Sequence, residues 1–182
     1  MKQVLFIVYG LMNKKLLFSI WKLKSVLNIT YQKVYIFKQS LVFNMINKKI
    51  FINTDGGSRG NPGRAAIGIV IFDENRSLLA EHKECIGEAT NNIAEYKALI
   101  RGLEIASAHT RGEVHCFLDS EVVVRQVNGA YRLKAEHLRA LYYVLKDREK
   151  AFSKVIYNFV QRENKYQLQA DRLVNDALDN GQ

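Results

Sequence analysis

Proline and cysteine are scarce in this chain of 182 residues, which contains one proline and two cysteines. Cys85 and Cys116 form no CxxC pair and fall in predicted strands, so we expect buried free thiols and not a disulfide. Free thiols are typical of a reducing compartment, and we therefore expect the protein to be cytoplasmic. No internal repeat or low-complexity segment follows residue 45, and the length suits one domain with an appendage.

Acidic residues are absent from the first 44 positions, although these positions hold seven lysines. The rest of the chain has 20 basic and 18 acidic residues, so it contributes only +2 to the net charge of +9. The overall basicity, which would suggest a nucleic-acid partner, therefore belongs to this leader. Residues 45–182 must instead bind a polyanion through local basic patches and bound cations.

Long apolar runs are missing as well. The longest run in the leader, Val4 to Met12, is far short of the ~20 residues that a transmembrane helix needs, so we expect no transmembrane segment. Lys2 stands before an apolar stretch, as in a signal peptide, yet no cleavage site of small residues follows it.

The composition of the leader is unlike that of the remainder, because it also lacks alanine, arginine and proline. We interpret residues 1–44 as translated upstream sequence that is not part of the functional protein. Met45 then becomes the functional start, and the domain spans residues 45–182. A membrane-surface or partner-binding helix and an ordered part of the domain are the alternative interpretations.

Beyond Met45 the pattern of apolar residues predicts both strands and helices. Apolar runs and alternation indicate strands over 49–55, 65–73, 77–87, 113–118 and 154–160. Helical periodicity indicates helices over 92–108, 120–128, 134–150 and 168–179, the first of them capped by Asn91 or Asn92. The glycine-rich segment 56–63 indicates a turn. The order βββαβααβα predicts an α/β fold, with a mixed five-stranded sheet of three antiparallel strands and two parallel additions, and helices on both faces.

Four carboxylates lie at the ends of predicted elements. Asp55 and Asp119 end apolar strands, Glu95 lies in the first turn of a helix, and Asp171 lies near the start of the last helix. Carboxylates that converge at one end of a sheet are costly unless hard cations neutralise them. Four carboxylates balance the charge of two divalent ions, which is the arrangement of two-metal phosphoryl chemistry.

Each acid taken alone has a simpler explanation. Asp55 could be a turn residue, and Asp119 could be the N-cap of the helix that follows it. Glu95 could merely complement the helix dipole, and Asp171 could be exposed to solvent. The occurrence of all four at the ends of elements makes four independent explanations improbable. The sequence therefore favours a metal centre.

Four segments of the chain also resemble a known family. They read "TDGGSRGNPG", "ATNNIAEYKAL", "LDSE" and "ADRLVNDAL", and they occur in the order and approximate spacing of type 1 ribonuclease H. The resemblance covers about residues 48–179. It is closest to the compact bacterial and archaeal branch, because the chain lacks the basic protrusion of the longer bacterial enzymes.

The resemblance implies a ribonuclease H-like fold and hydrolysis of the RNA strand of RNA/DNA hybrids. Asp55, Glu95, Asp119 and Asp171 take the metal-binding catalytic positions. Two Mg²⁺ ions are implied, ~3.5–4 Å apart, with Mn²⁺ as an alternative; they would activate a water and stabilise the departing 3′ oxygen. Asp55 and Asp119 would contact both ions, Glu95 would hold the water-side ion and sense a ribose hydroxyl, and Asp171 would complete the other site.

Other positions match residues that hold the hybrid backbone. They are Asn61, Thr90, Asn91 and Asn92, and the backbone from Gly56 onward can donate to phosphate and accept from a 2′-OH. Thr90 and Asn91 at a helix N-terminus would make a phosphate pocket for the DNA strand.

The chain departs from the family at three positions near the site. Many relatives carry a histidine in the loop before the last aspartate, whereas here the loop is "VQRENKYQLQAD" and Glu163 is the nearest substitute. Gln167 replaces an asparagine, and Glu121 replaces a glutamine that touches RNA in some relatives. These departures affect rate, metal preference and substrate range, and leave the reaction class as it is.

Two other functions stay open. A non-catalytic nucleic-acid-binding module is one, although four acids without metal would repel a phosphate backbone. A nuclease of the same fold that acts on double-stranded RNA or other polynucleotides is the second, although integrases and junction resolvases lack the combined glycine-rich and "TNN" motifs. We expect a monomer that binds RNA/DNA hybrid, with double-stranded RNA as a further candidate substrate.

Overall fold

The computed structural model describes residues 35–36, 39 and 48–181, and residues 47–182 form one compact unit. The predicted leader, residues 1–44, lies almost wholly outside the described residues. The described unit contains nine elements in chain order: β1 (Ile50–Gly60), β2 (Gly63–Asp73), β3 (Leu78–Ala89), α4 (Asn91–Ala106), β4 (Glu113–Leu118), α5 (Glu121–Val127), α6 (Glu136–Glu149), β5 (Lys154–Phe159) and α7 (Gln167–Asn180). None of the helices in this part of the chain has the length and apolar character needed to cross a membrane.

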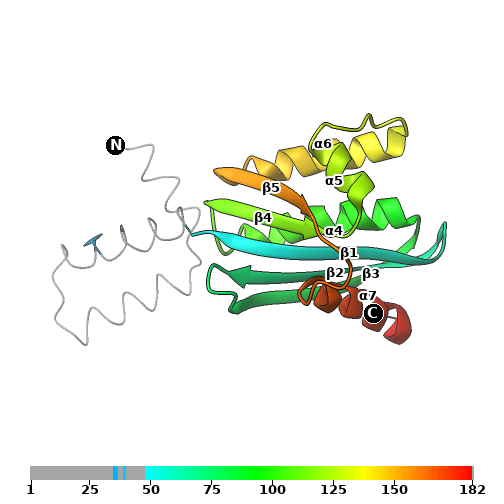
Figure 1. Ribbon diagram of the computed structural model, residues 1–182, viewed down its shortest axis with the longest axis horizontal. Helices are drawn as coiled ribbons and strands as arrows, with labels where there is room; N and C mark the ends of the chain where they lie inside the picture. Colours follow the sequence, from blue (N-terminus) through cyan, green and yellow to red (C-terminus); the bar gives the residue numbers. More distant parts are fainter. Residues whose placement is uncertain (1–34, 37–38, 40–47, 182) are drawn as a thin grey trace. The chain divides into compact units, whose positions relative to one another are not determined.

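The five strands form one mixed sheet in the order β3-β2-β1-β4-β5, as Figure 1 shows. β1, β2 and β3 form an antiparallel meander, whereas β4 pairs parallel to β1 and β5 pairs parallel to β4. The predicted sheet is therefore confirmed, including its three antiparallel strands and two parallel additions. Asp55 on β1 and Asp119, directly after β4, consequently belong to neighbouring central strands.

The glycine-rich segment predicted as a turn is largely strand. β1 continues through Gly56 to Gly60, and only Asn61 and Pro62 separate it from β2. The prediction was wrong because glycine usually disfavours strands, whereas here it admits a helix close to the strand. Asp55 therefore lies in the middle of β1 and is not a turn residue.

The first long helix also begins earlier than predicted. Its N-cap is Thr90, whose Oγ1 accepts a hydrogen bond from the Ile93 amide at 3.4 Å, so neither predicted asparagine is the cap. Because α4 starts at Asn91, Glu95 lies in the second turn and not in the first. It is buried, so complementing the helix dipole at the surface does not explain it.

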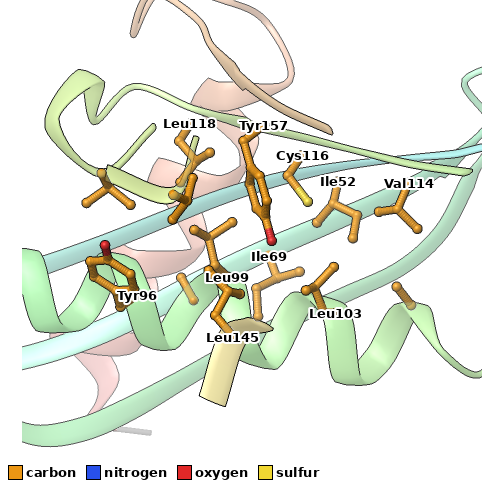
Figure 2. Close-up of a cluster of buried hydrophobic side chains, with 14 of the residues drawn as sticks. Ile52, Ile69, Tyr96, Leu99, Leu103, Val114, Cys116, Leu118, Leu145 and Tyr157 are labelled. Atoms are coloured by element: carbon orange, nitrogen blue, oxygen red, sulfur yellow. The ribbon is translucent and has the colours of Figure 1, made fainter. Parts of the chain in front are cut away.

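The main core lies between one face of the sheet and helices α4 and α6. Figure 2 shows Leu99 and Leu103 of α4 facing Ile52 and Ile69 of the sheet, with Leu145 of α6 beside them. All of these side chains are at most 1% exposed. Burial of each such aliphatic side chain stabilises the fold by about 1.5–3 kcal/mol.

The opposite face of the sheet is covered by α7. Val174, Ala177 and Leu178 pack on Ala66 of β2, so the predicted helices on both faces are confirmed. Cys116 is buried in the main core and Cys85 is partly buried, and both are free thiols.

Candidate active site

A close contact between β1 and α4 places Glu95 beside Asp55. A Cβ atom at Gly56 would lie 2.2 Å from the Ala94 carbonyl carbon and 2.3 Å from the Glu95 nitrogen. Any larger residue at position 56 would therefore push the helix away from the strand. Gly56 is required for this approach, which brings the backbone of Glu95 next to the residue that follows Asp55.

A second close contact, between β2 and α7, brings Asp171 to the same site. Gly68 is the register partner of Asp55 on β2, and a Cβ atom there would lie 2.2 Å from the Ala170 carbonyl oxygen. The helix can cross the strand only because position 68 has no side chain. Asp171, the next residue of α7, is thereby held near Asp55 from the second face of the sheet.

Three of the four predicted acids form a tight group. Asp55, Glu95 and Asp119 each offer a carboxylate oxygen, and these three oxygens lie within 4.8 Å of one another. Asp171 is not part of that group, but it lines the same cavity of about 410 Å³. The structure therefore brings all four predicted acids to one cavity, with three of them in direct proximity.

Burial and mutual repulsion raise the pKa values of Asp55, Glu95 and Asp119. Burial, followed by the charges of Asp119 and Asp171, raises the pKa of Asp55 from 3.8 to about 7. Burial and the charges of Asp55 and Asp119 raise the pKa of Glu95 well above its ordinary value, and burial raises the pKa of Asp119. The site thus resists carrying several negative charges unless a cation compensates them.

The donor set fits divalent cations. The Glu95 Oε2 atom is buried and has no hydrogen-bond partner in the part of the chain that the structure describes, which is costly for a carboxylate oxygen and is explained by an ion that it would bind. Carboxylate oxygens are the ligands that Mg²⁺ and Mn²⁺ prefer. Asp55, Glu95 and Asp119 are therefore suited to hold such ions, with Asp171 at the edge of the group.

Arg162 is the cation that faces these acids in the described structure, and sequence reasoning missed it. Its Nη2 donates to Asp171 Oδ1 at 2.6 Å, and its Nε lies 4.0 Å from Asp119 Oδ2. Its charge lowers the pKa values of Asp55, Glu95 and Asp119 and partly offsets the effect of burial. The signal in the sequence is the position of Arg162 in the loop before α7, next to Glu163, which the sequence analysis names as the substitute for the histidine.

The capping explanation for Asp119 is wrong. The N-cap of α5 is Ser120, and no side chain caps that helix by a hydrogen bond. The side chain of Asp119 is 17% exposed and points toward the cavity, where it lies near Arg162. Asp171, which is 20% exposed, is likewise not a solvated surface acid.

The predicted backbone-binding residues lie together beside the cavity. Asn91 Oδ1 accepts hydrogen bonds from the Ser58 amide at 2.8 Å and from its hydroxyl at 2.7 Å. The backbone N–H of Asn91 in turn donates to Asn61 Oδ1 at 3.2 Å. Thr90 caps the same helix, and Asn92 is exposed in its first turn. The structure therefore joins the start of α4 to the end of β1 by side-chain hydrogen bonds.

Glu121 and Glu163 lie apart from this group. Glu121 begins α5, where it is exposed and accepts from Arg125 at 2.6 Å and 2.9 Å. Glu163 is exposed in the loop before α7, and neither residue lines the cavity. Five polar residues that do line it were not predicted as site residues: Ser58, Arg59, Ser120, Arg162 and Asn175.

Comparison with protein families gives a match to the reverse transcriptase-like family over residues 53–177. The chain is also similar to the bifunctional protein Rv2228c of Mycobacterium tuberculosis, with 44% identity over 133 residues. That match covers 72% of this chain but only 36% of the relative, so the chain spans about a third of that protein's length.

Two matches to solved structures extend over nearly the whole of the other protein. The crystal structure of RNase H1 from the archaeon Halobacterium salinarum matches with a TM-score of 0.70 and 36% identity, over 72% of this chain and 98% of that one. LC11-RNase H1, solved in complex with an RNA/DNA hybrid, matches with a TM-score of 0.69 and 40% identity, over 72% and 98% of the two chains.

Proposed function

The chain belongs to the type 1 ribonuclease H family, among the reverse transcriptase-like proteins, and on that basis we propose that it hydrolyses the RNA strand of RNA/DNA hybrids. The observation that carries the proposal is the buried group of Asp55, Glu95 and Asp119, in which Glu95 Oε2 has no hydrogen-bond partner among the described residues. Such a group is unfavourable without cations, and it is suited to reactions at phosphate.

We assign ion binding to these three acids, with Asp171 as the fourth ligand. When bound there, two Mg²⁺ ions would supply an activated water and charge neutralisation at the leaving 3′ oxygen, and Mn²⁺ is the alternative. The protein holds the carboxylates at fixed positions from both faces of the sheet. Arg162, between Asp119 and Asp171, is placed to attract the scissile phosphate into the cavity.

Substrate binding would use the polar residues next to the acids. Asn91, Asn61 and Ser58 already fix one another by hydrogen bonds, so their remaining donors and acceptors present a rigid surface to a sugar–phosphate backbone. Thr90 and Asn92 at the start of α4 add the amide groups of a helix N-terminus, which favour phosphate. Discrimination of RNA from DNA would come from contacts to the 2′-OH. The free cysteines support a cytoplasmic location, and we propose a monomer as the working form.

Cleavage assays on four labelled substrates test this proposal. The substrates are an RNA/DNA hybrid, double-stranded RNA, single-stranded RNA and duplex DNA, each incubated with Mg²⁺, with Mn²⁺ or with excess EDTA. We expect metal-dependent internal cleavage of the RNA strand in the hybrid. Binding of hybrid without any cleavage would favour a non-catalytic module, and preferential cleavage of double-stranded RNA would favour the other nuclease function.

A further inference from the structure

Arg59 lies on the same face of β1 as Asp55, four residues further along the strand. Alternate residues of a strand share a face, so Asp55, Gly57 and Arg59 point to the same side of the sheet. Two contacts identify that side as the α7 side. A Cβ atom at Gly57 would meet Val174 of α7 at 3.1 Å, and Arg59 Nη2 pairs with Asp179 Oδ1 of the same helix.

The cavity that holds the acids extends to this arginine. Its lining includes Arg59 and Ser58 at one end, and Asp119 and Arg162 at the other. Arg59 therefore belongs to the wall of a continuous depression that starts at the acid cluster and runs along β1 and α7. A molecule that occupies the acid cluster and extends along this depression would reach the guanidinium group.

A contribution to folding stability does not explain why an arginine stands at position 59. The Arg59 and Asp179 side chains are 52% and 60% exposed, and an ion pair of that kind contributes little to folding. Arg59 is also the register partner of Arg64 across the hairpin, and like charges directly opposite each other are unfavourable. The hairpin thus places two arginines opposite each other, and of the two it is Arg59 that lines the cavity and pairs with a carboxylate of α7.

We propose that Arg59 is a positioning residue that binds a backbone phosphate of the hybrid a few nucleotides away from the scissile bond. Arg59 lies four residue steps along the strand from Asp55, a distance of roughly 13 Å at about 3.3 Å per residue. That distance corresponds to about four nucleotides at ~3.4 Å of rise each. In the absence of substrate the guanidinium pairs with the exposed Asp179 carboxylate, and its planar group has further N–H donors that face solvent and can bind a phosphate. This inference rests on the proposed ribonuclease function.

Kinetics of three variants on a long hybrid give the first test. Arg59→Ala is expected to raise KM by roughly three- to tenfold with kcat nearly unchanged. It should also reduce the salt slope, which is the steepness of the fall of log affinity with log salt concentration, by about one. Arg59→Lys keeps the charge and should retain most of the salt slope. Arg148→Ala is the matched control, because Arg148 is also a partly exposed arginine that pairs with a carboxylate, Glu104, near the other end of α4. Arg148→Ala should change neither KM nor the salt slope.

Asp179→Asn separates phosphate binding from a structural role of the ion pair. It breaks the same pair but leaves the arginine in place and removes a negative charge from the depression. If Arg59 binds phosphate, this variant should keep the salt slope and a KM close to that of the wild type. If the pair serves only to fasten α7, Asp179→Asn and Arg59→Ala should have equal effects, and that result would overturn the inference.

A set of hybrids with one uncharged backbone linkage each locates the phosphate that Arg59 contacts. Each hybrid carries a single methylphosphonate, and its position moves by one nucleotide from one hybrid to the next, either in the DNA strand or at a 2′-deoxy position of the RNA strand. The wild type should lose affinity at one or two positions about four nucleotides from the cut, and Arg59→Ala should be insensitive there; the strand concerned identifies the phosphate. Identical position profiles for both proteins would overturn the inference while leaving the ribonuclease function intact. A wild type that cuts no hybrid would instead refute the proposed function, and the inference with it.

Discussion

Gln167 donates from its side-chain nitrogen to both the Thr54 carbonyl oxygen, at 2.8 Å, and the Asp119 carboxylate, at 3.3 Å. Its side-chain oxygen accepts from Asn53 Nδ2 at 3.2 Å. Gln167 is fully buried at the start of α7, so one amide connects that helix, strand β1 and the acid that follows β4. This arrangement fixes the orientation of Asp119 relative to Asp55.

Replacement of Gln167 by methionine should therefore impair both folding and catalysis. The variant leaves Asn53 and the Thr54 carbonyl without their partner, which should lower the free energy of unfolding by about 1–3 kcal/mol. It also frees Asp119 to rotate, so kcat should fall more than KM rises. Urea denaturation and steady-state kinetics measure the two effects. Gln161→Met, at an exposed position of the preceding loop, is the control, and equal behaviour of the two variants would refute the positioning role.

Asp119→Asn should separate catalysis from stability. The amide oxygen can still accept the hydrogen bond from Gln167, whereas the charge that raises the pKa values of Asp55 and Glu95 is lost. We expect no activity, and a metal-free protein that is as stable as the wild type or more stable by about 1 kcal/mol. Mg²⁺ should raise the Tm of the wild type more than that of the variant. A metal-free variant that melts clearly lower than the wild type would show that Asp119 is primarily structural.

The metal-free protein should lose stability as the pH rises toward neutrality. The pKa of Asp55 is raised from 3.8 to about 7 on folding, so the folded state holds this proton more tightly than the unfolded chain does. Its stabilising contribution is fully present below pH 3.8 and is lost as the pH rises through about 7, with a magnitude of about 4 kcal/mol at most. Asp55→Asn cannot ionise, so the difference in unfolding free energy between wild type and variant should change across this window. A constant difference would contradict the raised pKa.

Deletion of residues 1–44 should leave the catalytic rate on short hybrids nearly unchanged. The nine described elements all lie within residues 50–180, and every residue assigned to the site lies there too. The comparison is between the full chain and the shortened chain at low salt, where an electrostatic contribution from seven lysines would be largest. Failure of the shortened chain to fold, or loss of most of its activity, would show that the leader is integral.

The fold was largely predictable because apolar periodicity sets which faces of strands and helices are buried. The positions of Asp55 and Asp119 follow from it, since β1 and β4 are parallel neighbours in the sheet. What the periodicity did not indicate was that β1 continues to Gly60. Local propensity treats a glycine-rich segment as a turn, whereas the close packing of α4 on Gly56 is a tertiary requirement.

The distant partners of the cations in the site were beyond the reach of sequence patterns. Arg162 meets Asp119 across 43 positions, and Arg59 meets Asp179 across 120. Asp171, the other partner of Arg162, is only nine residues away. Nothing in the local sequence of either arginine specifies the distant partner, because these contacts depend on how the strands, the loop and α7 pack together. By contrast, the acids were recognisable because buried charge is rare enough to need a reason.

Analysis of the cleavage products from a labelled RNA/DNA hybrid tests the central claim most directly. With Mg²⁺, the wild type should produce internal fragments of the RNA strand that end in 5′-phosphate and 3′-hydroxyl groups, while the DNA strand stays intact. Asp119→Asn, and the wild type in excess EDTA, should produce none. Full activity in EDTA, or equal cutting of duplex DNA, would contradict the account of a metal-dependent ribonuclease built on Asp55, Glu95, Asp119 and Asp171.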